Sequence, residues 1–336
     1  MATAIQTAET RPQSLDDFIG NEKAVDLIKY QLKVSIELGK DFPHSLLLGP
    51  AGHGKTLLAE LVAKELNAGF VYSSATAIGD PITFREVMKE CVGKEKSVVL
   101  IDEFHALPKS VRTNLLSLLE YPGIICTPGE LDVTTNRIVS KKGYITKEYM
   151  PDGVTLMFAT NYISNIDEAF KSRLLEIRLL EYSQEEKEVI AKTTLLRSLI
   201  DISPKGEAEI ARRCKNAREI SKICEIITDT LTIQNKTVAI LADVNLAFSR
   251  LNIDENGLGP IERKYLHYLA DNNTVGLESI ASYIDMTRKD VSSSIEPVLI
   301  RKGFTVITSG GRKITLNGLK AIKRELSQED QFVQLR

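Results

Sequence analysis

Apolar and polar positions follow two different rhythms along the first half of the chain. Apolar side chains recur at helical spacing between Asn21 and Leu38, which predicts a helix with one buried face. Shorter apolar runs, bounded by Pro, Gly or charged residues, predict buried strands instead. We predict strands at Ser45–Leu48, Gly69–Tyr72, Ser97–Ile101 and Val154–Ala159, and helices at 57–66, 83–92 and 110–119. This alternation indicates an α/β domain whose parallel sheet is covered by helices on both faces.

The pattern becomes helical after residue 180. Helix starts are marked by Ser or Thr three residues before Glu, by Pro in the first turn, and by single Asn or Asp caps. One such signal, Thr83–Glu86, lies in the first half of the chain. After residue 180 the signals are Ser183–Glu186, Ser203–Pro204, Asn216 and Asp243. We therefore predict that residues 181–252 are helical throughout and form a small domain.

A Gly-rich joint at 256–260 marks a further boundary. Three helical patterns follow it, and then two strand-like runs, Phe304–Thr308 and Lys313–Leu316, with Gly310-Gly311 as the turn between them. Three helices followed by a hairpin predict a winged helix. The predicted domains are thus 1–180, 181–255 and 256–336.

Composition narrows the class of protein. Of 336 residues, 43% are hydrophobic and 26% charged, which excludes a largely disordered chain. No apolar run approaches a membrane-spanning length, and the start of the chain lacks the features of a signal peptide. The four cysteines form no CxxC pair, which argues against a zinc site or a disulfide framework and favours a reducing cytoplasm. A net charge of −2 indicates no general attraction to nucleic acid.

A phosphate-binding motif follows the first predicted strand and opens the next helix. The motif G-x-x-x-x-G-K-[ST] is formed by Gly49, Pro50, Ala51, Gly52, His53, Gly54, Lys55 and Thr56. Its glycines let backbone N–H groups surround phosphate oxygens, and the helix N-terminus adds partial positive charge. We expect Lys55 to contact the β- and γ-phosphates of ATP and Thr56 to hold Mg²⁺.

Two adjacent carboxylates end the third predicted strand. The run Val98-Val99-Leu100-Ile101 is followed by Asp102 and Glu103. In a P-loop enzyme Asp102 is expected to bind Mg²⁺ through water, and Glu103 to orient and deprotonate the attacking water. We expect the following His105 to be structural.

These motifs, with three further residues, resemble those of the AAA+ ATPases. Asn161 ends the strand after the carboxylates, where that family has sensor 1, a polar group that senses the γ-phosphate. Arg173 follows at the place of the arginine finger, which enters the neighbouring subunit's site. Arg218 opens a lid helix at the place of sensor 2. The resemblance implies a P-loop AAA+ domain followed by a helical lid.

The resemblance narrows to the RuvB family, the hexameric ATPases that drive Holliday-junction branch migration. Arg11-Pro12 to Ile19-Gly20-Asn21-Glu22 is similar to that family's opening stretch, and Glu296-Pro297-Val298-Leu299-Ile300 to a motif before its wing. The resemblance spans about residues 11–326. It implies adenine contacts by Phe18 and Ile19, with Tyr182 from the start of the lid; core packing of Phe18 and Ile19 is an equal alternative.

The chain also departs from the RuvB pattern. Ala51 and His53 stand where the family usually has Pro and Leu, and Asn161 replaces the usual Thr. The segment 121–153 lies where RuvB inserts the hairpin that docks on RuvA. Its alternating pattern predicts a hairpin here too. It is longer and more polar, which counts against a RuvA-like partner.

The winged helix of RuvB grips DNA, and this chain has cations at the corresponding places. Arg288 and Lys289 open the predicted third helix, and Arg312 and Lys313 lie at the wing turn. Contacts from such residues to phosphates bind any sequence and weaken with salt. A winged helix that contacts protein is the alternative.

Together the motifs predict an ATP-dependent, ring-forming DNA translocase of the RuvB type. It would be a cytoplasmic homo-hexamer that uses ATP and Mg²⁺ and acts on four-way junctions or duplex DNA, without a membrane partner. Two alternatives stay open at this point. One is an AAA+ switch of the clamp-loader or helicase-loader type, and the other is a non-motor DNA-binding protein whose assembly ATP regulates.

Overall fold

The computed structural model describes residues 11–120, 125–128, 130–132, 137–139, 145–148, 153–162 and 166–323. The chain groups into two compact units. Unit 1 extends to Asp201 and includes Asn216–Cys224, and unit 2 holds Ile202–Lys215 and the residues from Glu225 onward. The predicted division into three domains, with boundaries at 180 and 255, stays a prediction. Among the residues described, no helix combines the length and apolarity needed to cross a membrane.

Unit 1 is built on a five-stranded parallel sheet. Its strand order is β2-β3-β8-β1-β9. The bounds are β1 Ser45–Leu48, β2 Gly69–Ser74, β3 Ser97–Asp102, β8 Val154–Thr160 and β9 Leu175–Arg178. Four of these strands confirm the predictions. The prediction missed β9, because charged residues alternate with apolar ones in this strand at the edge of the sheet.

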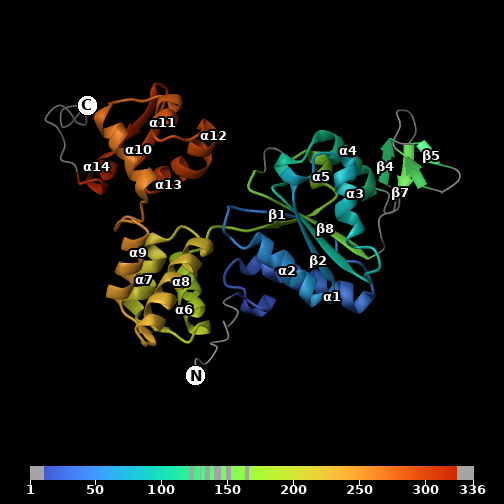
Figure 1. Cartoon of the computed structure of the whole chain (residues 1–336), viewed down its shortest axis with the longest axis horizontal. Coiled ribbons are helices and arrows are strands. Elements are labelled where there is room, and N and C mark those ends of the chain that lie inside the picture. Colours follow the sequence, from blue (N-terminus) through green and yellow to red (C-terminus); the bar gives the residue numbers. More distant parts are fainter. Residues whose placement is uncertain are drawn as a thin grey trace. The chain divides into compact units, whose positions relative to one another are not determined.

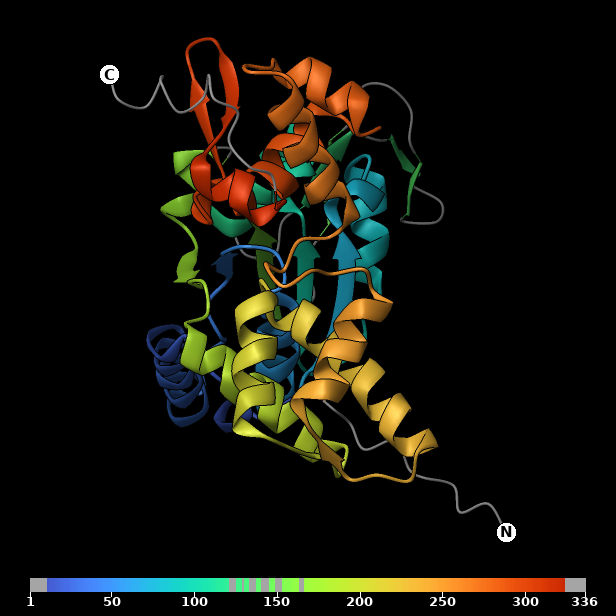
Figure 2. The ribbon, with the colours of Figure 1, turned by 90° about the vertical axis from the view of Figure 1, so that its left-hand side faces the viewer.

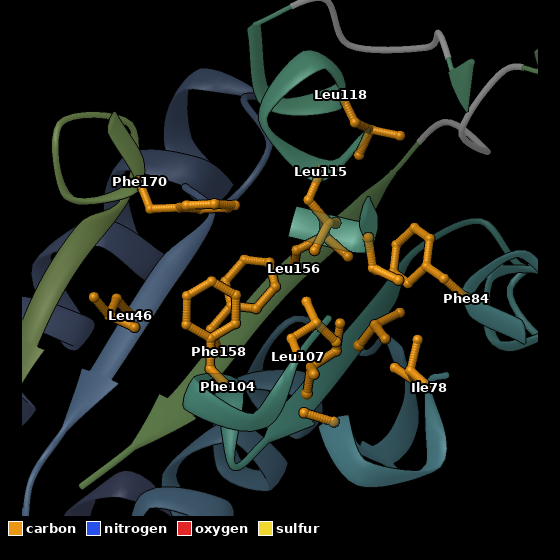
Figure 3. Close-up of a cluster of buried hydrophobic side chains, with 14 of the residues drawn as sticks. Leu46, Ile78, Phe84, Phe104, Leu107, Leu115, Leu118, Leu156, Phe158 and Phe170 are labelled. Atoms are coloured by element: carbon orange, nitrogen blue, oxygen red, sulfur yellow. The ribbon is translucent and has the colours of Figure 1, made fainter. Parts of the chain in front are cut away.

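Helices cover both faces of this sheet, as predicted (Figure 1). Alternate strand residues point to opposite faces. Leu47 and Met157 join the cluster formed with α1 (Glu22–Leu38) and α2 (Lys55–Glu65). Leu46, Leu156 and Phe158 join the cluster on the other face, which Figure 3 shows. That second cluster is covered by α3 (Pro81–Lys89), α4 (Lys109–Glu120) and α5 (Glu168–Lys171).

The start of α3 differs from the prediction. The N-cap is Asp80, whose carboxylate accepts the backbone N–H of Thr83 at 2.7 Å. Pro81 occupies the first turn, where its missing N–H costs nothing. The predicted start at Thr83 was wrong, because Asp80-Pro81 is the stronger local signal.

The segment 121–153 contains two antiparallel strand pairs. Strand β4 (Ile125–Pro128) pairs with β7 (Ile145–Glu148), and β5 (Glu130–Asp132) pairs with β6 (Arg137–Val139). The predicted hairpin architecture is therefore confirmed for these strands. The rest of the segment, apart from Gly153, lies outside the described residues.

The region after residue 180 is largely helical, as expected. It contains α6 Gln184–Arg197, α7 Pro204–Arg213, α8 Ala217–Ile233 and α9 Leu241–Arg250. The capping box at Ser183 and Glu186 and the cap at Asn216 are both present. The prediction was wrong in two details. The short strands β10 (Asp201–Ile202) and β11 (Val238–Ala239) interrupt the helices. Asp243 lies inside α9 and accepts the N–H of Ile240, which is the N-cap.

Unit 2 also contains the predicted winged helix. Its elements are α10 Pro260–Asp271, α11 Leu277–Tyr283, α12 Arg288–Asp290, a π-helical turn Val291–Ile295, α13 Glu296–Arg301, β12 Thr305–Thr308, β13 Gly311–Ile314 and α14 Leu316–Ala321. Figure 2 shows β12 and β13 as a projecting red hairpin. The second strand begins at Gly311, which pairs with Thr308, and Leu316 belongs to α14. The predicted strand Lys313–Leu316 was therefore displaced toward the C-terminus.

A largely buried histidine next to β1 makes the stability of unit 1 depend on pH. The N–H of Leu156 donates to His44 Nδ1 at 3.0 Å, so this nitrogen carries no proton. Burial lowers the pKa of His44, with the Asp41 charge opposing it. The unfolded chain therefore binds the proton more readily than the folded chain. The resulting stability is complete above the ordinary pKa of about 6.5 and is lost as the pH falls below it.

We therefore expect His44→Asn to weaken the acid sensitivity of the protein. The Asn side-chain oxygen can still accept the Leu156 N–H, but it does not titrate. Between pH 6.5 and 5, the free energy of unfolding of this variant should fall less steeply than that of the wild type, by up to about 1.4 kcal/mol per pH unit. Denaturant unfolding at pH 7, 6 and 5 measures the difference, and parallel curves for the two proteins would contradict it.

Candidate nucleotide-binding site

The phosphate-binding loop connects β1 to α2, as the motif requires. Gly52 and Gly54 adopt left-handed backbone conformations, with φ of +77° and +89°. A Cβ at Gly52 would lie 2.7 Å from the side chain of Asn216, and one at Gly54 would lie 2.7 Å from the ring of Phe18. Only glycine fits these two positions, so the loop keeps the conformation that exposes backbone N–H groups.

Lys55 is the buried cation of this loop, with a relative exposure of 8%. Its ammonium donates to the carbonyl oxygens of Gly49 at 2.8 Å and Pro50 at 2.9 Å, and to Asn161 Oδ1 at 2.8 Å. Burial lowers the pKa of Lys55 to about 8. A desolvated ammonium held by neutral oxygens is suited to pair with an anion, so these residues fit a nucleotide polyphosphate.

The paired carboxylates lie where β3 ends. The backbone N–H of Glu103 donates to Asp102 Oδ1 at 2.8 Å, and Glu103 itself has a positive φ of 57°. The charges of Asp102 and Glu103 both raise the pKa of Lys55 against the effect of burial, which places the carboxylates in the electrostatic surroundings of the ammonium. Glu103 is half exposed, as a group that meets water must be.

Thr56 and Asp102 are the residues available to hold Mg²⁺. Thr56 lies in the first turn of α2 and Asp102 at the end of β3. The described residues contain no cluster of three or more His, Cys, Asp or Glu side chains that could bind a metal on its own. A hydroxyl and a carboxylate are suitable donors for Mg²⁺, which is usually held by one or two protein groups, water and substrate phosphates.

Aromatic side chains lie beside the loop. The hydroxyl of Tyr182 donates to the carbonyl oxygen of His53 at 3.2 Å, and the two rings stack with centroids 5.2 Å apart. His53 Nδ1 lies 2.9 Å from the carbonyl oxygen of Ala51. Phe18 is buried against Gly54, and Ile19 is half buried. Adenine contacts by Phe18, Ile19 and Tyr182 stay a prediction. The sequence did not show that His53 packs against Tyr182.

The structure relates both predicted sensor residues, Asn161 and Arg218, to Lys55. Asn161 contacts the ammonium directly, and the charge of Arg218 lowers the pKa of Lys55. Arg173 follows α5, and its Nη1 donates to the carbonyl oxygen of Ala169 at 2.7 Å. Its role in a neighbouring subunit's site stays a prediction.

The four predicted DNA contacts have different environments. Lys289 and Lys313 are exposed, and Arg288 is exposed beside Glu278. Arg312 instead points inward, and its guanidinium donates to Glu296 Oε1 at 2.7 Å and Oε2 at 3.2 Å. The side chain of Arg312 is only 17% exposed. This bidentate pair gives Arg312 a structural partner that the sequence did not reveal.

The fold and the site together define a class of protein. A P-loop between β1 and α2, carboxylates at the end of β3, and an Asn at the end of β8 that contacts the P-loop Lys are the parts of an AAA+ ATPase domain. The model of the Holliday junction DNA helicase RuvB P-loop domain matches residues 10–138, and that of the RuvB C-terminal winged helix domain matches residues 255–323. The chain is a RuvB-like AAA+ protein.

Solved structures agree with this assignment. A mutant of RuvB from Thermotoga maritima is 27% identical, with a TM-score of 0.79 over 94% of this chain and 100% of that one. The Thermotoga maritima RuvB Holliday junction branch migration motor is 26% identical, with a TM-score of 0.75 over 95% of this chain and 99% of that one. The similarity therefore extends through the region between the two matched domains.

Proposed function

We propose that this protein is an ATP-driven, ring-forming DNA translocase that moves four-way junctions. The contact between Lys55 and Asn161 carries the proposal, because it joins the phosphate-binding lysine to the end of the sensor strand. A site built this way can distinguish ATP from ADP. The similarity to a branch migration motor over nearly the whole chain supports DNA as the object of the resulting movement.

Each residue of the site has a part in the proposed hydrolysis. The loop Gly49–Thr56 surrounds the phosphates with N–H groups, and Lys55 contacts the β- and γ-phosphates. Thr56 would hold Mg²⁺ and Asp102 would bind it through water, and the ion would neutralise charge on the phosphates. Glu103 accepts a proton from the attacking water. Asn161 orients that water relative to the γ-phosphate.

The proposed ring makes hydrolysis depend on a neighbour. Arg173 enters the adjacent subunit's site and stabilises charge that develops on the phosphates, as arginine fingers do. Arg218 contacts phosphate from α8 and links the lid helices to the nucleotide. We propose a hexamer, as the RuvB resemblance implies, and a location in the cytoplasm, which suits the free thiols of Cys91, Cys214 and Cys224.

The DNA surface of this proposal consists of Arg288, Lys289 and Lys313. All three are exposed, whereas Arg312 is engaged with Glu296. Contacts from such residues to phosphates give affinity without sequence preference, which suits a translocase. A RuvA-like protein is not required by this surface.

The test is movement of a synthetic four-way junction. We expect the wild-type protein with ATP and Mg²⁺ to convert a labelled junction to its two duplex products. Lys55→Ala should neither convert the junction nor hydrolyse ATP. The double variant Arg288→Ala/Lys289→Ala should keep basal ATPase activity but bind DNA more weakly, with a smaller salt dependence. ATP hydrolysis without junction movement would favour a loader-type switch, and DNA binding without hydrolysis would favour a non-motor protein.

A further inference from the structure

His105 lies between the carboxylate of Glu103 and the end of the sensor strand. It belongs to a short helical turn, Phe104–Ala106, directly after β3. Its Nε2 is 3.8 Å from Glu103 Oε2, and its Nδ1 is 3.2 Å from Thr160 Oγ1. The side chain is only 10% exposed. One imidazole thus connects two strands that are neighbours in the sheet, β3 and β8.

The hydrogen bonds of Thr160 determine which nitrogen of His105 carries the proton. Thr160 is 1% exposed, and its Oγ1 already accepts the N–H of Tyr162 at 3.1 Å. A buried hydroxyl hydrogen needs an acceptor. Among the residues described, His105 Nδ1 is the acceptor within reach, so we assign the tautomer in which Nδ1 accepts from this hydroxyl and Nε2 carries the hydrogen. That N–H faces the Glu103 carboxylate.

The surroundings keep this imidazole in place. Its ring meets the ring of Tyr162 edge to face, with centroids 4.6 Å apart. The preceding residue, Phe104, packs against Phe158 at 4.8 Å and Phe170 at 5.1 Å between ring centroids, and Figure 3 shows these three rings together. The half-exposed Glu103 side chain, in contrast, has water on one side. The fixed partner in this pair is therefore His105.

We propose that His105 is a positioning residue for ATP hydrolysis. Its Nε2–H draws one oxygen of Glu103 toward the protein, which leaves the other oxygen to accept a proton from water. The imidazole also contacts Thr160, which directly precedes Asn161. The side chain of Asn161 contacts Lys55. The position of His105 thus affects Glu103 directly, and it affects Asn161 and Lys55 through Thr160. This inference rests on the proposed role of Glu103 in hydrolysis.

The distance of 3.8 Å between His105 Nε2 and Glu103 Oε2 is longer than a hydrogen bond, so the proposal requires it to shorten in the reacting complex. Catalytic hydrogen bonds are often long in the absence of substrate and shorten in the reacting complex. Small displacements of a general base are costly, since a misplacement of about 1 Å can reduce a rate about 100-fold. The contribution of His105 should therefore appear in kcat and not in nucleotide binding.

Four substitutions test this arrangement. His105→Phe keeps a planar ring beside Tyr162 but removes the N–H. It should lower kcat for ATP hydrolysis about 10- to 100-fold. The KM for ATP and the Kd of a fluorescent ATP analogue should stay unchanged within about two-fold. His105→Gln places an amide N–H near the same point and should recover most of kcat. Thr160→Val should lower kcat in the same way, and the control Thr160→Ser, which keeps the hydroxyl, should not. The double variant Thr160→Val/His105→Phe should have a kcat no lower than that of either single variant.

The outcomes separate this inference from the proposed function. A His105→Phe variant with wild-type kcat overturns the inference. Equal loss in His105→Phe and His105→Gln, together with lower thermal unfolding temperatures, overturns it too, because that result means a structural role. An inactive wild type, or a Glu103→Gln variant as active as the wild type, overturns the proposed function and the inference with it.

Discussion

Arg173→Ala and Glu103→Gln are each expected to abolish ATP hydrolysis, and a mixture of the two proteins is expected to recover part of it. Loss of an arginine finger costs a factor of about 10³–10⁵ in rate. Loss of the carboxylate that deprotonates water is expected to be similarly severe. In the proposed ring these two groups come from different subunits. The site of an Arg173→Ala subunit keeps Glu103. This site is complete when the neighbour that supplies the finger is a Glu103→Gln subunit, which keeps Arg173.

The size of the recovery follows from the symmetry of the ring. In a cyclic assembly with head-to-tail interfaces, random mixing at equal amounts restores about a quarter of the interfaces. Steady-state ATPase activity should accordingly rise toward about a quarter of the wild-type value at equal mixing, and fall to zero at either end of the series.

A matched control uses two groups from the same subunit. Lys55 and Glu103 lie in one chain and serve one site, and the charge of Glu103 acts on the Lys55 ammonium. Mixing Lys55→Ala with Glu103→Gln therefore leaves every site incomplete and should recover nothing. Recovery in this control, or none in the Arg173→Ala mixture when imaging shows rings, would contradict a shared site.

Arg312→Ala is expected to destabilise the winged helix strongly. The Glu296 side chain is 4% exposed, and Arg312 supplies two of its hydrogen bonds while the hydroxyl of Tyr265 supplies another at 3.1 Å. The pair raises the pKa of Arg312, and burial together with the Glu296 charge raises that of Tyr265. Removing one partner of a buried ion pair costs about 3–5 kcal/mol, because the other charge stays buried without compensation.

Hydrogen exchange measures this loss where it occurs. Amides of α13 and of the β12–β13 hairpin should exchange at least about 100-fold faster in Arg312→Ala, since each 1.4 kcal/mol changes an equilibrium tenfold. The double variant Arg312→Met/Glu296→Gln should recover most of the protection, because it removes both charges and keeps a side-chain oxygen that accepts the Tyr265 hydroxyl. Lys313→Ala serves as the control, since Lys313 is exposed and its loss should leave exchange almost unchanged.

The same double variant tests the predicted DNA role of Arg312. With the fold recovered and the charge removed, unchanged affinity for duplex DNA would leave Arg312 a purely structural residue. A marked loss of affinity in the recovered protein would support the predicted DNA contact.

Much of the ATPase site was visible in the sequence, because its signals are local. The P-loop residues Gly49–Thr56 and the pair Asp102–Glu103 are contiguous, and their conformations follow from glycine, from strand ends and from a helix start. The parallel sheet followed from short buried runs between amphipathic helices. The family resemblance indicated Asn161 as a sensor, and the structure places it on Lys55.

What the sequence left undecided depends on partners that are distant along the chain. Strand β9 is stabilised by pairing with β1, although its own pattern is weak. Arg312 and Lys313 are neighbours of similar chemistry, but the buried Glu296 engages only the first of them. His105 meets Thr160, 55 positions further on. The sequence by itself determined the chemistry that the site can hold, because that depends on residue types at short spacing. Only the tertiary structure decided which charges are exposed and which are paired, because burial and pairing depend on contacts between distant segments.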